Sequence, residues 1–92
     1  MPRTSGRIGK VGKKTVEAVR RAVAGTLNRE MEIEVGRLEG GRWAVTLLMG
    51  KERSTPIGIE PWEMAAMRQV TLVPAHKRGI FLRQYTMLVG RS

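Results

Sequence analysis

The sequence contains no cysteine and no aspartate, and its one histidine is His76. Without cysteine the chain has no disulfide, no thiol nucleophile and no cysteine-based metal site. One histidine excludes a metal site built from several histidines, and the neighbouring Lys77 and Arg78 would repel a metal cation. We therefore expect neither a cofactor nor a bound metal.

Long apolar runs are also missing. No stretch is long enough to span a membrane, and the basic N-terminus is not followed by the apolar segment of a signal peptide. We expect no membrane partner, and a location inside the cell that is cytoplasmic or nucleoid-associated.

Positive charge, in contrast, is abundant. Lysine and arginine total 17 against 8 acidic residues, which gives a net charge of +9. Arginine supplies most of this charge, and its planar fork binds phosphate through two hydrogen bonds. Such a surface is typical of proteins that bind a polyanion. The charge predicts a nucleic-acid partner, and an acidic protein surface is the alternative.

The segment GRIGKVGKKT, residues 6–15, resembles a phosphate-binding loop in composition. A nucleotide-cleaving loop needs the spacing G-x-x-x-x-G-K-[ST]. Here Arg7 occupies the position of the first glycine relative to Gly12, and Thr15 comes one residue too late. No apolar strand precedes the segment, so we expect no nucleotide hydrolysis and no enzyme activity.

At 92 residues the chain predicts one small domain. Residues 1–13 carry little that can be buried, and we expect a flexible basic arm. Residues 14–90 are expected to form a single α+β domain. A core of this size is small, and six methionines offer adaptable packing, so a homodimer is a further expectation.

A helix is predicted over residues 14–28, because Val16, Val19, Val23 and Leu27 recur on one helical face. It is followed by a change of period. Residues 31–38 and 42–49 alternate apolar and polar side chains, which predicts a hairpin closed by the glycines between them.

The second half of the chain gives shorter signals. Residues 55–59 predict an edge strand, because Pro56 lacks a backbone donor. A helix is predicted over residues 61–69, with Trp62 packed inward as an anchor. Strands over residues 70–73 and 80–89 flank a basic loop. The expected order is arm-α-β-β-(β)-α-β-β, a mostly antiparallel sheet with helices packed on one face.

On a strand, Phe81, Arg83 and Tyr85 would project from one face and could form a platform on which bases stack. The alternative is that this face is turned into the core. The candidate nucleic-acid-binding residues are Arg3, Arg7, Lys10, Lys13, Lys14, Arg20, Arg21, Arg42, Arg53, Lys77, Arg78, Arg83 and Tyr85.

Together these features predict a non-catalytic nucleic-acid-binding protein, with DNA favoured over RNA. The basic arm and surface arginines would grip backbone phosphates largely without regard to sequence. The alternative is a small basic interaction module, or a regulator that docks on an acidic surface of a larger nucleic-acid enzyme.

Overall fold

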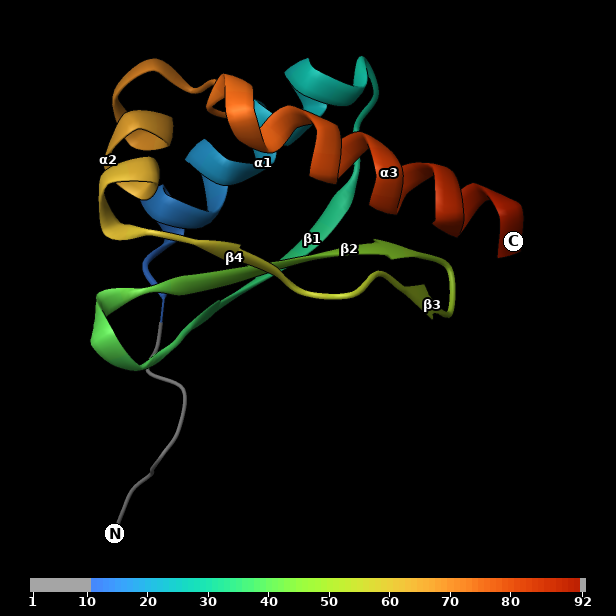
Figure 1. Cartoon of the computed structure of the whole chain (residues 1–92), viewed down its shortest axis with the longest axis horizontal. Coiled ribbons are helices and arrows are strands. Elements are labelled where there is room, and N and C mark those ends of the chain that lie inside the picture. Colours follow the sequence, from blue (N-terminus) through green and yellow to red (C-terminus); the bar gives the residue numbers. More distant parts are fainter. Residues whose placement is uncertain (1–10, 92) are drawn as a thin grey trace, which may run out of the picture.

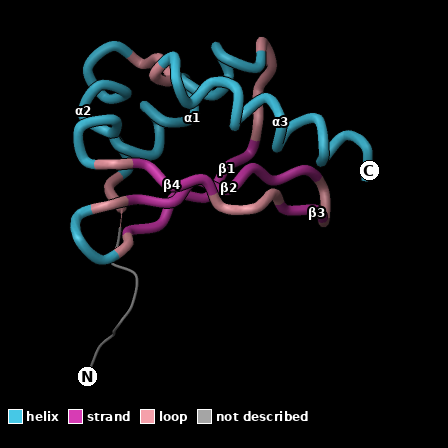
Figure 2. The backbone as a smooth tube through the Cα atoms, viewed as in Figure 1, coloured by secondary structure: helices cyan, strands magenta, loops and turns pink. Residues whose placement is uncertain are grey.

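The computed structural model describes residues 11–91. Its elements are α1 (Lys13–Leu27), β1 (Glu32–Arg37), the short turn η2 (Glu39–Gly41), β2 (Trp43–Met49), β3 (Glu52–Arg53), β4 (Ile57–Ile59), α2 (Pro61–Val70) and α3 (Ala75–Arg91). Figures 1 and 2 show the helices in one layer and the strands in another. The predicted α+β class, with an antiparallel sheet and helices on one face, is confirmed.

The hairpin of β1 and β2 is the centre of the sheet. Its register places Val35 opposite Val45 and Ile33 opposite Leu47. Gly40 and Gly41 close the connection with φ values of 76° and 74°, a backbone conformation that favours glycine. On its other side, β2 pairs antiparallel with both β3 and β4, so β4 is an edge strand as Pro56 predicted.

Alternation along the strands separates the two faces of the sheet. Trp43, Val45 and Leu47 turn toward the helices and are buried in the core, as are Ile57 and Ile59 of β4. On the open face, small residues form a row across the strands, because Gly36 and Gly58 both lie opposite Ala44.

Helix α1 lies within one residue of its predicted bounds. Its buried stripe is Thr15, Ala18, Val19, Ala22 and Val23, so the inward face is centred slightly away from the predicted valine row. The helix contacts both α2 and α3. It therefore fixes how the other two helices are placed over the sheet.

Helix α2 confirms the predicted helix of residues 61–69 and extends it by one residue. Its buried side chains are Glu63, Met64 and Met67, while Trp62 is 61% exposed. The prediction that Trp62 packs inward is therefore wrong. The helix turns a different face to the core, on which Met64 and Met67 are fully buried.

The C-terminal third differs most from the prediction. The segment expected as a strand over residues 70–73 is the end of α2 followed by a loop, and the segment of residues 75–89 is helical. Phe81, Tyr85 and Leu88 follow the spacing i, i+4, i+7, which places them on one helical face. Phe81 and Leu88 are fully buried, and Tyr85 packs against the same core. The apolar residues of this segment also fit the alternation of a strand. Packing of Phe81 and Leu88 against the core favours the helix.

Helix α3 closes the outer edge of the sheet with polar side chains. Gln84 Oε1 accepts a hydrogen bond from the backbone N–H of Thr55 at 3.2 Å, and Lys77 Nζ donates to the carbonyl of Gly58 at 2.6 Å. Arg91 donates to the Arg53 carbonyl at 3.3 Å. These bonds satisfy edge groups that another strand would otherwise pair with. Among residues 11–91, no helix is long and apolar enough to cross a membrane.

Candidate nucleic-acid interface

The first turn of α1 has an unusual charge. Gly12 precedes the helix without a side-chain cap, and the first turn has no acidic residue but does carry Lys13 and Lys14. The positive end of the helix dipole ordinarily favours acidic side chains, by about 0.3–1 kcal/mol each. Two lysines here work against helix stability, and an anion bound at this end would relieve the repulsion.

Helix α2 brings a further cation to the same place. Arg68 lies in the last turn of α2 and is exposed. Its guanidinium donates to the hydroxyl of Thr15 at 3.4 Å, and Thr15 is itself buried on α1. This long hydrogen bond holds the arginine against α1 and leaves most of its five donors for other partners.

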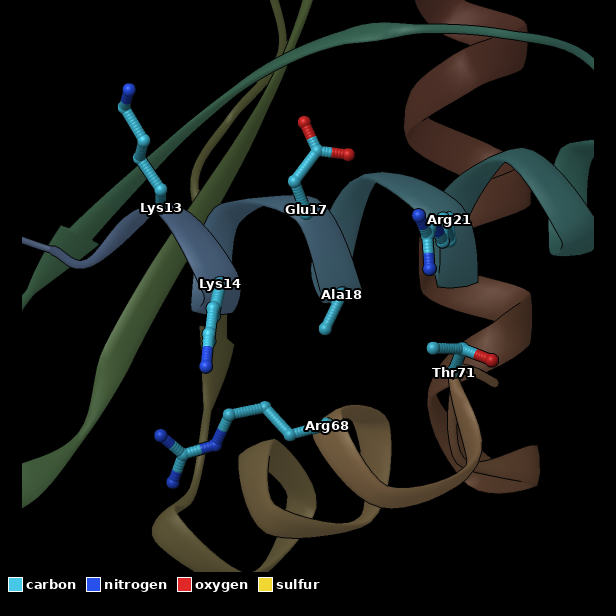
Figure 3. A pocket seen from close by; sticks show the side chains of 7 residues that line it. All are labelled: Lys13, Lys14, Glu17, Ala18, Arg21, Arg68 and Thr71. Carbon is cyan, nitrogen blue, oxygen red and sulfur yellow. The ribbon is translucent and has the colours of Figure 1, made fainter.

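An open hollow of about 370 Å³ lies between the two helices, lined by Lys13, Lys14, Glu17, Ala18, Arg21, Arg68 and Thr71. Figure 3 shows Lys14 and Ala18 pointing from α1 toward α2, with Arg68 opposite them. Arg21 and Thr71 lie farther along the same gap. Lys13 and Glu17 point away from α2. We call this site the basic hollow.

The charges of the basic hollow do not cancel. Four cations and one carboxylate line it, a formal sum of +3. The carboxylate of Glu17 is already engaged by Arg20, at 3.0 Å. Within residues 11–91, Lys13, Lys14 and Arg21 form no ion pair. The hollow therefore presents positive charge that the described residues leave uncompensated.

Thr71 marks the rim of the basic hollow. It ends α2 in the left-handed conformation, with φ 51° and ψ 42°, and its N–H donates to the Met67 carbonyl at 2.8 Å. A β-branched residue in this region is a genuine outlier. The turn carries the chain from α2 to Val73, which is fully buried. Core packing of Val73 thus offsets the strain.

A second hollow, of about 550 Å³, lies on the open face of the sheet. It is lined by small and apolar residues, together with an ion pair between Glu34 and Arg53. Because the two charges cancel, this hollow has no preference for an anion. It makes the basic hollow the better candidate for a phosphate ligand.

The structure brings together three of the predicted residues, Lys13, Lys14 and Arg21. Arg3, Arg7 and Lys10 lie outside the described residues. Arg20 does not line the hollow; it is paired with Glu17, and its Nε is buried without a hydrogen-bond partner among the described residues. Arg42 is exposed in the hairpin turn, and Arg53 is paired on the open face of the sheet.

The predicted residues of the C-terminal third are spread over α3. The prediction of a platform formed by Phe81, Arg83 and Tyr85 is wrong. A separation of two residues on a helix is about 200°, which places Arg83 opposite the aromatic pair.

Tyr85 and Arg78 are engaged in contacts within the protein. The hydroxyl of Tyr85 accepts a hydrogen bond from Arg29 at 2.8 Å, and the Arg29 guanidinium lies 5.8 Å from the Tyr85 ring centroid. Arg78 donates to the Val73 carbonyl at 3.2 Å.

Lys77 and His76 join a buried carboxylate that sequence reasoning did not single out. Glu63 is 1% exposed and accepts a hydrogen bond from the N–H of Glu60 at 2.8 Å, as half of a capping box at the start of α2. Its Oε2 forms a hydrogen bond with the ring of His76. Lys77 Nζ lies 3.5 Å from Oε1, the oxygen that accepts from Glu60. We call these three side chains the Glu63 network.

Burial, the largest single influence, raises the pKa of Glu63, but the hydrogen bonds from Glu60 and His76 and the charges of Lys77 and His76 outweigh it. The net effect lowers the pKa of Glu63 below its ordinary value. The carboxylate is thus held ionised in the interior. It ties α2 to α3, and through Lys77 to β4.

Arg68 was missed by sequence reasoning, although one signal was available. It lies four residues after Met64, which places it beside the buried face of a helix predicted over residues 61–69. Its contact with α1 depends on the angle at which α1 and α2 cross, and no local sequence pattern specifies that angle.

No family model, no curated protein and no solved structure matches this chain. Its class is therefore defined by the fold and the site alone: a small α+β protein with a cationic hollow between two helices. Among residues 11–91, no group of three or more potential ligand side chains could hold a metal ion.

Proposed function

We propose that this protein binds nucleic acid without catalysis, holding backbone phosphates in the basic hollow largely independently of sequence. DNA is the favoured polymer. The observation that carries the proposal is the convergence of Lys14, Arg21 and Arg68 on one hollow, in which Glu17, the one carboxylate among the described lining residues, is paired with Arg20. Cations clustered on one face in this way are typical of proteins that bind nucleic acid.

The spacing of the cations favours a polymer over a single phosphate. Lys14 and Arg21 are seven residues apart on α1, which is two helical turns and about 10 Å. Side chains at this separation can contact one phosphate only by converging, whereas in extended conformations they can contact successive phosphates of a polymer. Arg68 contributes a further contact from the opposite wall.

The same lining supports the proposal that binding is largely independent of sequence. Asparagine and glutamine, which recognise adenine through paired hydrogen bonds, do not occur among the residues that line the hollow. Lysine and arginine contacts to phosphate position the protein but carry no sequence information.

The test is a binding titration by fluorescence anisotropy, with labelled single-stranded DNA, duplex DNA and RNA of equal length at 50, 100 and 200 mM salt. Three phosphate contacts predict a slope of log K against log salt of about −2 to −3. Tighter binding of DNA than RNA is expected.

Arg68→Gln and Arg83→Gln form a matched pair, because each removes one positive charge from an exposed arginine. We expect Arg68→Gln to reduce the steepness of the salt slope by about 1 and Arg83→Gln to leave it nearly unchanged. A salt-independent affinity, or equal effects of the two substitutions, would contradict the proposal.

The alternative partner is an acidic surface of another protein. Val70 and Leu72 are 55% and 51% exposed on either side of Thr71, at the rim of the basic hollow. Protein interfaces typically combine an apolar centre with a polar and charged rim, and Val70 and Leu72 beside the cations of the hollow offer both. A Val70→Ser/Leu72→Ser variant decides between the two: unchanged binding to DNA supports the nucleic-acid proposal. Absence of DNA binding by the unmodified protein, with capture of an acidic protein lost in the variant, supports the alternative.

A further inference from the structure

Trp62 is a large aromatic side chain that the fold leaves in solvent. It is 61% exposed, whereas the other tryptophan, Trp43, is 8% exposed in the core. Burial of so large an aromatic side chain would stabilise the protein through the hydrophobic effect. Because the fold leaves this stabilisation unused, the exposed Trp62 ring is a candidate for contact with a ligand.

The ring of Trp62 is held in one orientation. It stacks on the imidazole of His76, with the ring centroids 5.2 Å apart and the planes at 22°. His76 is anchored in turn by its hydrogen bond to the buried Glu63 carboxylate. Pro61 and the capping box fix the backbone at the start of α2. An aromatic ring fixed in this way pays little entropy on binding.

Two arginines lie on the elements that meet near the start of α2. Arg68 is six residues further along α2, about 9 Å along the helix axis and about 240° around it, so it lies on the flank toward α1. The hairpin turn approaches the start of α2, since a Cβ built on Gly41 would lie 3.7 Å from the Pro61 ring. The next residue in that turn is the exposed Arg42. The surroundings favour a ligand that combines an aromatic group with phosphate.

We propose that Trp62, backed by His76, is a stacking platform for an unpaired base of single-stranded nucleic acid. The inference rests on the proposed function and deepens it, because it names single strands as the preferred form. A base in a duplex is stacked on both sides and cannot cover the ring, whereas an unpaired base can. The aromatic platform expected on the last strand thus has its counterpart at the start of α2.

Stacking and phosphate binding differ in their response to salt. Phosphate contacts release counterions and set the salt slope, while stacking contributes affinity at every salt concentration. Trp62→Ala should therefore weaken binding to single-stranded DNA about tenfold without changing the slope. Trp62→Phe should retain part of the affinity.

The experiment uses the full chain and a thymine 15-mer, alone and as a duplex with its complement. The Trp43→Phe variant leaves Trp62 as the only tryptophan, so its fluorescence reports on this ring. Quenching by the single strand and little change with the duplex are the expected results. Leu82→Ala is the control, because it removes another exposed apolar side chain, 45% exposed on α3.

Three outcomes separate this inference from the proposed function. Salt-dependent binding that Trp62→Ala leaves unchanged overturns the platform and retains the phosphate site. Equal weakening of single-strand and duplex binding also overturns it. Absence of binding to any nucleic acid by the unmodified protein overturns the proposed function and the platform with it. If Trp62→Ala does not fold, the fluorescence quenching of Trp62 in Trp43→Phe and the affinity of Trp62→Phe for the single strand still test the platform.

Discussion

Basic side chains meet α2 on both of its flanks, but their partners differ. On the flank toward α1, Lys14 and Arg68 face an open hollow and form no ion pair within residues 11–91. On the flank toward α3, Lys77 and His76 converge on the buried carboxylate of Glu63. The side chains on the α3 flank hold α2, α3 and β4 together, whereas Lys14 and Arg68 remain available to a ligand. In a chain with a net charge of +9, the presence of a carboxylate partner thus separates structural cations from candidate binding cations.

The largest effect is expected from Glu63→Ala. Removing this carboxylate leaves Lys77 and the N–H of Glu60 without their partner and opens a space beside the core. We expect the free energy of unfolding to fall by about 3 kcal/mol, measured by urea denaturation at neutral pH. Glu30→Ala, at an exposed acidic residue, should change it by less than about 0.5 kcal/mol. Similar losses for both variants would show that the Glu63 network does not stabilise the fold.

The next effect is on binding. The double variant Lys14→Gln/Arg68→Gln should weaken DNA binding about tenfold or more at 100 mM salt and reduce the steepness of the salt slope by about 2. Its stability should be nearly unchanged, since both side chains are exposed.

Lys77→Gln tests the other side of the comparison. It should lower stability, because its ammonium bonds the Gly58 carbonyl and faces Glu63. It should leave the salt slope of the folded protein unchanged. A slope reduced by Lys77→Gln as much as by Arg68→Gln would remove the distinction between the two flanks.

Sequence reasoning was most successful where the signal is local. The hairpin was predicted because alternation and a glycine pair act within a few residues, and α1 was predicted because its apolar face repeats at helical spacing. In α3, Gly79, Ile80 and Thr86 are poor helix formers, and the segment also alternates. Only the burial of Phe81 and Leu88 against the core decides in favour of a helix.

The candidate site was predictable in part for the same reason. Lys13, Lys14 and Arg21 lie on one predicted helix, so their proximity follows from its geometry. Arg68 comes close to them only because α1 and α2 are in contact, and these two helices are about fifty residues apart in the sequence. Trp62 was expected inside because tryptophan is usually buried, but Met64 and Met67 occupy the face that α2 turns to the core.

The pH dependence of stability gives a smaller effect. Because the folded pKa of Glu63 is lowered from 4.5, the unfolded chain binds this proton more tightly than the folded protein does. The contribution of Glu63 is therefore fully present above that value and is lost as pH falls through the folded pKa. We expect the urea midpoint to fall between pH 5 and pH 3, and to fall less in Glu63→Gln. An equally steep decline in the variant would show that other carboxylates account for it.

The smallest effect, and the one that probes the hollow most locally, is expected from Glu17→Gln. Among residues 11–91, Glu17 is the one carboxylate that lines the basic hollow, and this substitution removes it and releases Arg20 from its ion pair. Exposed pairs contribute little to stability, so the fold should be unaffected, while DNA affinity should rise about twofold. Glu30→Gln changes the net charge by the same amount at a residue that does not line the hollow, and it should raise affinity less. Equal increases in both variants would mean that the DNA responds to the net charge of the whole protein, because a local phosphate site would respond mainly to the charge at its own wall.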